Sequence, residues 1–155
     1  MSDVATAPGH DLALCISDLK ARKKDQALAE MATAAGGAGF VTDAPLLTEF
    51  LKLRERLGVT AIGKGVAIPH ARSTTVYLPR LVIARSPRGI DWSARDGTLV
   101  QLVILVLSPG EWSEESHHGW LARASSLARL QRNRQKLVDA STPAAASVII
   151  REALS

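Results

Sequence analysis

The sequence predicts an α/β fold of one domain, in which a central mixed β-sheet is flanked by helices. Short runs rich in Leu, Val and Ile alternate with longer segments whose apolar residues recur at helical spacing. Residues 99–107 are almost unbroken in aliphatic side chains, as expected for a strand that is covered on both faces. The length of 155 residues suits one domain with a sizeable core, and the sequence contains no internal repeat.

The first third of the chain predicts a strand and a helix. Residues 1–10 are small and polar, so we assign them to a flexible tail and residues 11–155 to the domain. An apolar run at 12–16 predicts the first strand. Alanine, leucine and methionine recur at helical spacing over 24–35, and the glycine-rich segment 36–39 is expected to end that helix.

A second helix is predicted to begin after Thr42 or Asp43, either of which can cap its first N–H groups. Pro45 then falls in the first turn, where its missing N–H is tolerated. Strands are expected at 81–84 and 99–107. The apolar face predicted for this second helix consists of Leu46, Leu47, Phe50, Leu51 and Leu57.

The last third of the chain predicts two helices. Ser113 is the expected cap of a long helix that runs to about Arg132. A final helix follows Thr142 and Pro143. The residues of the long helix that should face inward are Leu121, Ala124, Leu127 and Ala128.

Composition limits the classes of function. The charge of +4 is mild, and the arginines and Lys136 between 123 and 136 are interleaved with apolar rather than aromatic residues. This pattern favours a solvated helix face over nucleic-acid binding. The sequence has no apolar run long enough to span a membrane and no secretory signal, so we expect no membrane insertion and a cytoplasmic location. A single cysteine, Cys15, fits a reducing compartment and a buried strand position.

Residues 62–73 form the most informative segment, Ile-Gly-Lys-Gly-Val-Ala-Ile-Pro-His-Ala-Arg-Ser. Gly63 and Gly65 allow a tight turn or a close approach to a ligand. Pro69 fixes its own φ and favours an extended residue before it. His70 follows directly, and an imidazole held at such a junction is a candidate nucleophile at neutral pH.

Other segments agree with this one in order and spacing: 53–60, 89–92, 96–100, 102–111, and His117 followed by Leu121-Ala122-Arg123. Together they resemble the IIA proteins of the bacterial phosphoenolpyruvate-dependent phosphotransferase system, in the mannitol, fructose and nitrogen-related group. The resemblance covers roughly residues 12–154 and implies the fold of the mannitol and fructose IIA proteins.

The resemblance implies a role for each candidate residue. His70 matches the histidine that accepts the phosphoryl group, and His117 the second active-site histidine, which can donate an N–H to a phosphoryl oxygen. Arg54 lies sixteen residues before His70, as the family's arginine does, and can bind an oxygen with its planar guanidinium. Arg56 is the less favoured alternative for this role. Thr60 and Arg72 are weaker candidates for support of the phosphoryl group.

Four further positions differ from the family pattern or have another expected role. Val59 stands where the family commonly has serine, which puts the efficiency of transfer in question, and His118 replaces a usual leucine. Asp91 and Asp96 are expected to be turn residues rather than an acid–base pair.

The function implied is that of a phosphocarrier, a phosphotransferase-system component that needs no cofactor. Its partners would be an HPr-like donor and either a IIB domain or a regulated protein. The lone IIA-like domain favours a nitrogen-related regulatory IIA, with a sugar-specific IIA or a non-phosphorylated interaction module as alternatives.

A zinc-dependent or other hydrolase is a third possibility. Zinc lacks support because no Cys or carboxylate stands at ligand spacing near His70, His117 and His118. The sequence contains neither a phosphate-binding Gly-x-x-x-x-Gly-Lys-Ser/Thr loop nor a Gly-x-Ser-x-Gly nucleophile motif.

Overall fold

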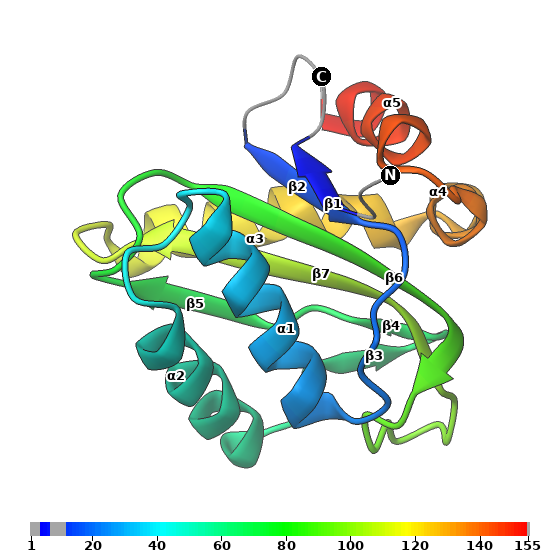
Figure 1. Ribbon diagram of the computed structural model, residues 1–155, viewed down its shortest axis with the longest axis horizontal. Helices are drawn as coiled ribbons and strands as arrows, with labels where there is room; N and C mark the ends of the chain where they lie inside the picture. Colours follow the sequence, from blue (N-terminus) through cyan, green and yellow to red (C-terminus); the bar gives the residue numbers. More distant parts are fainter. Residues whose placement is uncertain (1–3, 7–11, 155) are drawn as a thin grey trace.

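The computed structural model describes residues 4–6 and 12–154 as a twisted β-sheet with helices on both faces (Figure 1). The strands are β1 (Val4–Thr6), β2 (Ala13–Ile16), β3 (Ala61–Gly63), β4 (Val66–Ala67), β5 (His70–Ser73), β6 (Arg80–Ile90) and β7 (Val100–Pro109). The helices are α1 (Lys24–Gly37), α2 (Ala44–Leu57), α3 (Glu114–Arg129), α4 (Gln131–Asp139) and α5 (Pro143–Leu154). The predicted α/β class with a mixed sheet is confirmed.

Strand β7 organises the sheet, whose order is β1-β2-β6-β7-β4-β3 with β5 also paired to β7. On one side β7 pairs antiparallel with β6. On the other side it pairs parallel with β4 at Leu102 and Val103, and with β5 from Val106 to Pro109. Strands β4 and β5 therefore follow one edge of β7 in succession, separated only by residues 68–69.

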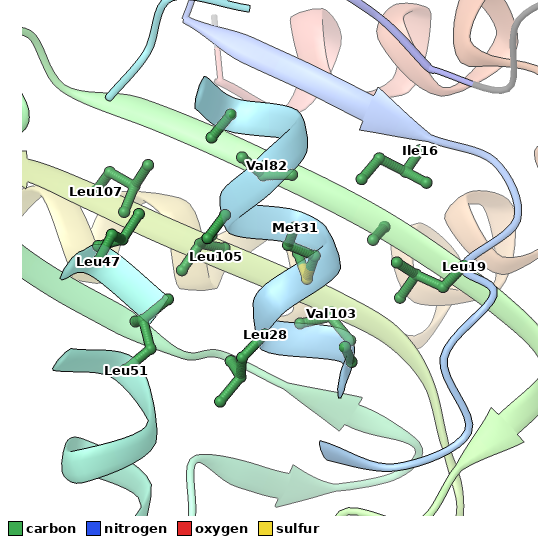
Figure 2. Close-up of a cluster of buried hydrophobic side chains, with 14 of the residues drawn as sticks. Ile16, Leu19, Leu28, Met31, Leu47, Leu51, Val82, Val103, Leu105 and Leu107 are labelled. Carbon is green, nitrogen blue, oxygen red and sulfur yellow. The ribbon is translucent and has the colours of Figure 1, made fainter. Parts of the chain in front are cut away.

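The side chains of β7 alternate between two cores. Val103, Leu105 and Leu107 point to the face covered by α1 and α2, where they meet Leu28 and Leu47 (Figure 2). Leu102, Ile104 and Val106 of the same strand belong to a second core with residues of α3, α4 and α5. This explains why the strand is aliphatic throughout: both of its faces are buried.

Cys15 belongs to the second core, as its expected place in a buried strand requires. Burial raises the pKa of its thiol to about 12, so the thiol stays protonated at neutral pH.

The ends of α1 and α2 agree with the predicted signals. Helix α1 closes where Gly39 adopts φ +78° and the N–H of Phe40 donates to Ala35 O at 2.8 Å. Asp43, rather than Thr42, caps α2, because its carboxylate accepts the N–H of Leu46 at 3.0 Å.

Part of the predicted apolar face of α2 is wrong. Leu47 and Leu51 are buried, whereas Leu46 and Phe50 are 50% exposed and Leu57 is 80% exposed. The stripe that packs on the sheet is narrower than the apolar sequence suggests, because α2 lies against α1 and the sheet edge rather than over the centre of the sheet.

The long helix predicted to run from Ser113 to about Arg132 is also wrong at its end. Its cap is correct, since Ser113 Oγ accepts the N–H of Ser116. The helix stops at Arg129, however, because Leu130 is extended (φ −90°, ψ 128°) and a separate helix, α4, begins at Gln131. The basic side chains of this stretch are thus divided between two helices.

Strands β1, β3, β4 and β5 were not predicted from the sequence, and the strand predicted at 81–84 is shorter than β6. Strand β1 falls within the segment assigned to the flexible tail, where Val4–Thr6 pair antiparallel with β2. The remainder of that segment lies outside the described residues. Among the described residues, no helix is long and apolar enough to cross a membrane.

The glycines of the His70 segment serve the turn between β3 and β4. Gly63, Lys64 and Gly65 all have positive φ, at +84°, +59° and +78°. The N–H of Lys64 donates to Asp96 Oδ2, and Gly65 O accepts the N–H of Gln101. These glycines therefore allow a tight turn and do not line the depression around His70 described below.

Candidate functional site

A depression of about 350 Å³ lies along the edge strand β5. Helix α2 reaches it from one side of the sheet and the first turns of α3 from the other. Its lining consists of Phe50 and Arg54 from α2, His70, Ala71 and Arg72 from β5, and Glu114, His117 and His118 from α3. Four of the five predicted site residues, all except Thr60, thus come together although they are far apart in the sequence.

His70 is the first residue of β5 and is half-buried. The backbone before it is held on both sides: the N–H of Ile68 donates to Thr60 O at 3.0 Å, and Pro69 O accepts the N–H of Val106 at 2.9 Å. The ring atom Nδ1 of His70 lies 3.0 Å from Ile68 O. Because a carbonyl oxygen only accepts hydrogen bonds, this contact places the proton on Nδ1 and leaves the lone pair on Nε2.

The surroundings of His70 lower its pKa from 6.5. Burial has the largest effect, and the charges of Arg54 and His118 act in the same direction. The hydrogen bond to Ile68 and the charge of Glu55 oppose them. The ring is therefore mainly neutral at pH 7, which is the state in which Nε2 is a nucleophile.

His117 faces His70 from the first turns of α3. Its side chain is buried, with 9% exposed, and the centroids of the two imidazole rings are 5.7 Å apart. Nδ1 of His117 lies 2.7 Å from the hydroxyl oxygen of Ser108, a fully buried residue of β7. Burial and the charges of His70, His118 and Arg72 lower the pKa of His117, while Glu114 opposes them.

Two guanidinium groups line the depression, that of Arg54 from α2 and that of Arg72 from β5. Arg54 is half-buried and donates from Nη1 to Gly58 O at 3.1 Å, at the end of α2. Arg72 is also half-buried and donates from Nη1 to Trp112 O at 2.8 Å, just before α3. Each of these contacts uses one N–H of a group that has five, so both groups can donate to an anion as well.

Thr60 does not line the depression. It is buried, and both its N–H (3.1 Å) and its hydroxyl donate to the carboxylate of Glu55. Its contribution to the site is therefore indirect, through the backbone that leads to His70. Val59, the position without the common serine, is 40% exposed and does not line the depression either.

Glu55 lies near the site but was not among the residues predicted from the sequence. It is only 3% exposed, and a carboxylate this deeply buried needs hydrogen-bond partners. Its position carried a signal: Leu47, Leu51 and Glu55 are spaced by four residues, so Glu55 continues the buried stripe of α2.

The remaining candidates are placed as follows. His118 is exposed and lines the depression, with its ring 5.8 Å from that of His117. Asp91 and Asp96 are turn residues, as predicted: Asp91 Oδ1 accepts the N–H of Ser93, and Asp96 Oδ1 accepts that of Thr98. Within the described part of the chain, no three His, Cys, Asp or Glu side chains form a group that could hold a metal ion.

The lowered pKa values of His70 and His117 predict that folding is weakened by mild acid. In the unfolded chain both rings take up a proton near pH 6.5, whereas in the folded chain they do so only at lower pH. Below about pH 6.5 the unfolded state binds more protons, so the free energy of unfolding falls as the pH falls. We expect the urea midpoint to drop between pH 7.5 and 5.5, and to drop less in the His70→Gln/His117→Gln double variant. Equal drops in the two proteins would contradict this cause.

Comparison with known proteins gives one family and several relatives. The family described as phosphoenolpyruvate-dependent sugar phosphotransferase system, EIIA 2, matches residues 11–153. A nitrogen regulatory protein of Bradyrhizobium diazoefficiens is 40% identical over 124 residues, which are 77% of this chain and 76% of the relative. The fructose-specific EIIABC component of Bacillus subtilis is 30% identical over 87% of this chain, which spans only 21% of that relative.

Among solved structures, the nitrogen regulatory protein IIA-Ntr of Neisseria meningitidis has the same fold. The TM-score is 0.73 at 26% identity, and the match covers 89% of this chain and 90% of the other.

Proposed function

Because the chain belongs to the phosphoenolpyruvate-dependent sugar phosphotransferase system EIIA 2 family, we propose that it is a phosphocarrier that accepts a phosphoryl group on His70. The observation that carries this proposal is the contact of His70 Nδ1 with Ile68 O. It leaves Nε2 unprotonated on a ring that lines an open depression and faces a second histidine. The donor is proposed to be the phosphohistidine of an HPr-like protein, and the place of action the cytoplasm.

The proposed step is a direct transfer between two imidazoles. The lone pair of His70 Nε2 attacks the phosphorus, and a new P–N bond forms. The P–N bond of the donor breaks, and its electron pair stays on the donor's ring. The Nδ1 proton of His70 remains on the ring, where Ile68 O stabilises the positive charge that develops.

His117 is proposed to donate a hydrogen bond to a phosphoryl oxygen. When the hydroxyl of Ser108 donates to Nδ1 of His117, the proton of the neutral ring lies on Nε2. Nε2 can then serve as the donor. Phosphoryl transfer depends mainly on positioning and charge stabilisation, and this arrangement provides both.

Arg54 is proposed to contact both the phosphoryl oxygens and the incoming carrier. We expect Arg54→Ala to slow phosphorylation by an HPr-like carrier by about 10- to 100-fold, since a hydrogen bond to a charged group contributes about 1.5–3 kcal/mol. Arg54→Lys should recover only part of the rate, because an ammonium group keeps the charge but lacks the planar fork. Initial rates of phosphate incorporation measure the effect.

Arg56→Ala is the matched control, since Arg56 is an exposed arginine of the same helix and does not line the depression. Circular dichroism would check that each variant is folded. If Arg54→Ala accepted phosphate at the wild-type rate, Arg54 would have no role in transfer and Arg72 would be the remaining cation of the depression.

Within the family we propose a nitrogen-related regulatory role, in which phosphorylation changes the binding of a partner. The support is the match to the nitrogen regulatory protein, 40% identical over 76% of its own length, whereas this chain spans only 21% of the fructose-specific component. A fructose-type IIA that passes phosphate to a IIB domain is the alternative, supported by the longer match to that component, 87% of the chain against 77%. Phosphorylated protein mixed with a purified fructose-type IIB domain separates the two, because only the alternative predicts rapid loss of the phosphate to IIB.

A further inference from the structure

We propose that Glu55 is a positioning residue for His70, acting through the backbone between the two. This inference deepens the proposed function and rests on it, because it concerns how the accepting ring is held. Glu55 does not line the depression and is too deeply buried to meet a partner protein.

The first step leads from Glu55 to Thr60. Glu55 lies in the last turn of α2, and both oxygens of its buried carboxylate accept hydrogen bonds from Thr60. One bond comes from the N–H of Thr60 and the other from its hydroxyl. A buried carboxylate is strongly destabilising unless its lone pairs are used, so these two bonds hold residue 60 firmly against the helix.

The second step leads from Thr60 to His70. Thr60 O accepts the N–H of Ile68, and Ile68 O in turn accepts the Nδ1–H of His70. The hydrogen bonds are therefore continuous from the carboxylate to the imidazole. Ile68 O determines how the His70 ring is oriented and which ring nitrogen carries the proton. If residue 60 moves, Ile68 O moves with it.

The charge of Glu55 acts in the same direction as its hydrogen bonds. It raises the pKa of His70, against the effects of burial, Arg54 and His118. The other charged or titratable groups around the ring are Arg72, Glu114 and His117. The carboxylate therefore also favours the positive charge that develops on the ring during transfer.

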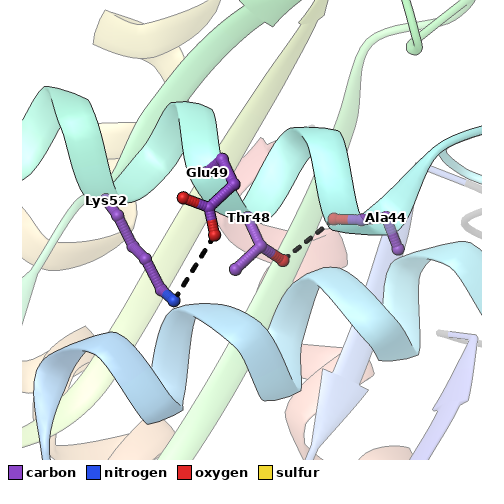
Figure 3. A network of polar contacts seen from close by, with 4 residues as sticks. All are labelled: Ala44, Thr48, Glu49 and Lys52. Carbon is purple, nitrogen blue, oxygen red and sulfur yellow. Dashed lines mark hydrogen bonds and ion pairs between the residues drawn. The ribbon is translucent and has the colours of Figure 1, made fainter.

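A matched control exists on the same helix. Glu49 is 70% exposed, and its carboxylate lies 3.7 Å from Nζ of Lys52, one turn further along α2 (Figure 3). Glu49→Gln removes one negative charge from α2 but leaves Glu55 and Thr60 untouched. It therefore separates the specific role of Glu55 from a general effect of helix charge.

The test measures the His70 ring by ¹⁵N NMR in the full chain, without any phosphoryl donor. In the wild type and in Glu49→Gln we expect the proton on Nδ1. In Glu55→Gln the amide can still bond to Thr60, so the tautomer should be retained and the pKa of His70 should fall. In Glu55→Ala the fraction with the proton on Nδ1 should fall, and phosphorylation should slow by roughly tenfold or more.

Thr60 provides a second pair of variants if Glu55→Ala fails to fold. Thr60→Val removes the hydroxyl bond to Glu55 and should shift the tautomer as Glu55→Ala does, whereas Thr60→Ser should restore the wild-type spectrum. The inference about Glu55 is overturned if the His70 tautomer is unchanged in Thr60→Val and in folded Glu55→Ala, and the pKa of His70 is unchanged in Glu55→Gln. This outcome leaves the proposed function intact. Absence of phosphate on the wild-type protein instead overturns the proposed function, so the two failures are distinguishable.

Discussion

The His70→Ala variant is expected to incorporate no acid-labile phosphate from phosphoenolpyruvate, enzyme I and an HPr-like carrier, under conditions that label the wild type fully. The expectation follows from the position of one atom. Nε2 of His70 is the unprotonated nitrogen of a mainly neutral ring in the depression, whereas Nδ1 of His117 already contacts the hydroxyl of Ser108. Acid lability of the label identifies a P–N bond rather than a phosphate ester.

His118→Ala is the control for this experiment. His118 lines the same depression but is exposed and lies beyond His117, so its loss should leave labelling largely intact. Labelling of His70→Ala at the wild-type level would assign the phosphoryl group to another residue and remove the basis of the proposed function. No labelling of the wild type would favour the alternative of a non-phosphorylated interaction module.

The features that could be predicted from the sequence are those fixed by local rules. An aliphatic run covered on both faces identified β7, and side chains that cap helix ends identified the starts of α2 and α3. His117 lies seven residues before Ala124, one of the residues predicted to face inward, and both are buried.

The features that could not be predicted depend on distant partners. Strands β4 and β5 have two and four residues, and both pair with residues of β7 that lie 36 positions further along the chain. The break at Leu130 gives no local signal, since no glycine or proline stands there. Phe50 is exposed because of the position of α2 on the sheet. The sequence of α2 alone does not determine that position.

The link between Glu55 and Thr60 shows the same limit within the site. The family resemblance implied that Thr60 lies near the phosphoryl group. In the structure its hydroxyl instead donates a hydrogen bond to the buried carboxylate of Glu55. Glu55 follows Arg54 directly in the sequence, but its side chain points away from the depression. Successive residues of a helix differ in direction by about 100°. One turn of α2 thus supplies both a cation to the depression and a buried anion to the backbone behind it.

The His117→Ala variant is expected to accept phosphate more slowly than the wild type and to pass it on very poorly. His117 is proposed to donate a hydrogen bond to the phosphoryl group, and it does not attack the phosphorus itself. Removal of one such preorganised donor commonly reduces a rate by about 10²–10³. Transfer to a IIB domain, or back to the donor, should fall by about this factor, because the group then leaves without the charge stabilisation that His117 supplies.

Comparison with Ser108→Ala tests the mechanism of this effect. Loss of the Ser108 hydroxyl leaves the ring of His117 in place but frees its Nδ1, so the tautomer that puts the proton on Nε2 is no longer selected. We expect a smaller loss than in His117→Ala, since part of the population keeps the donating tautomer. Quench-flow measurement of the onward transfer provides both rates. If His117→Ala passed phosphate on at the wild-type rate, the 5.7 Å approach of the two rings would serve packing alone, and Arg54 and Arg72 would have to stabilise the phosphoryl group.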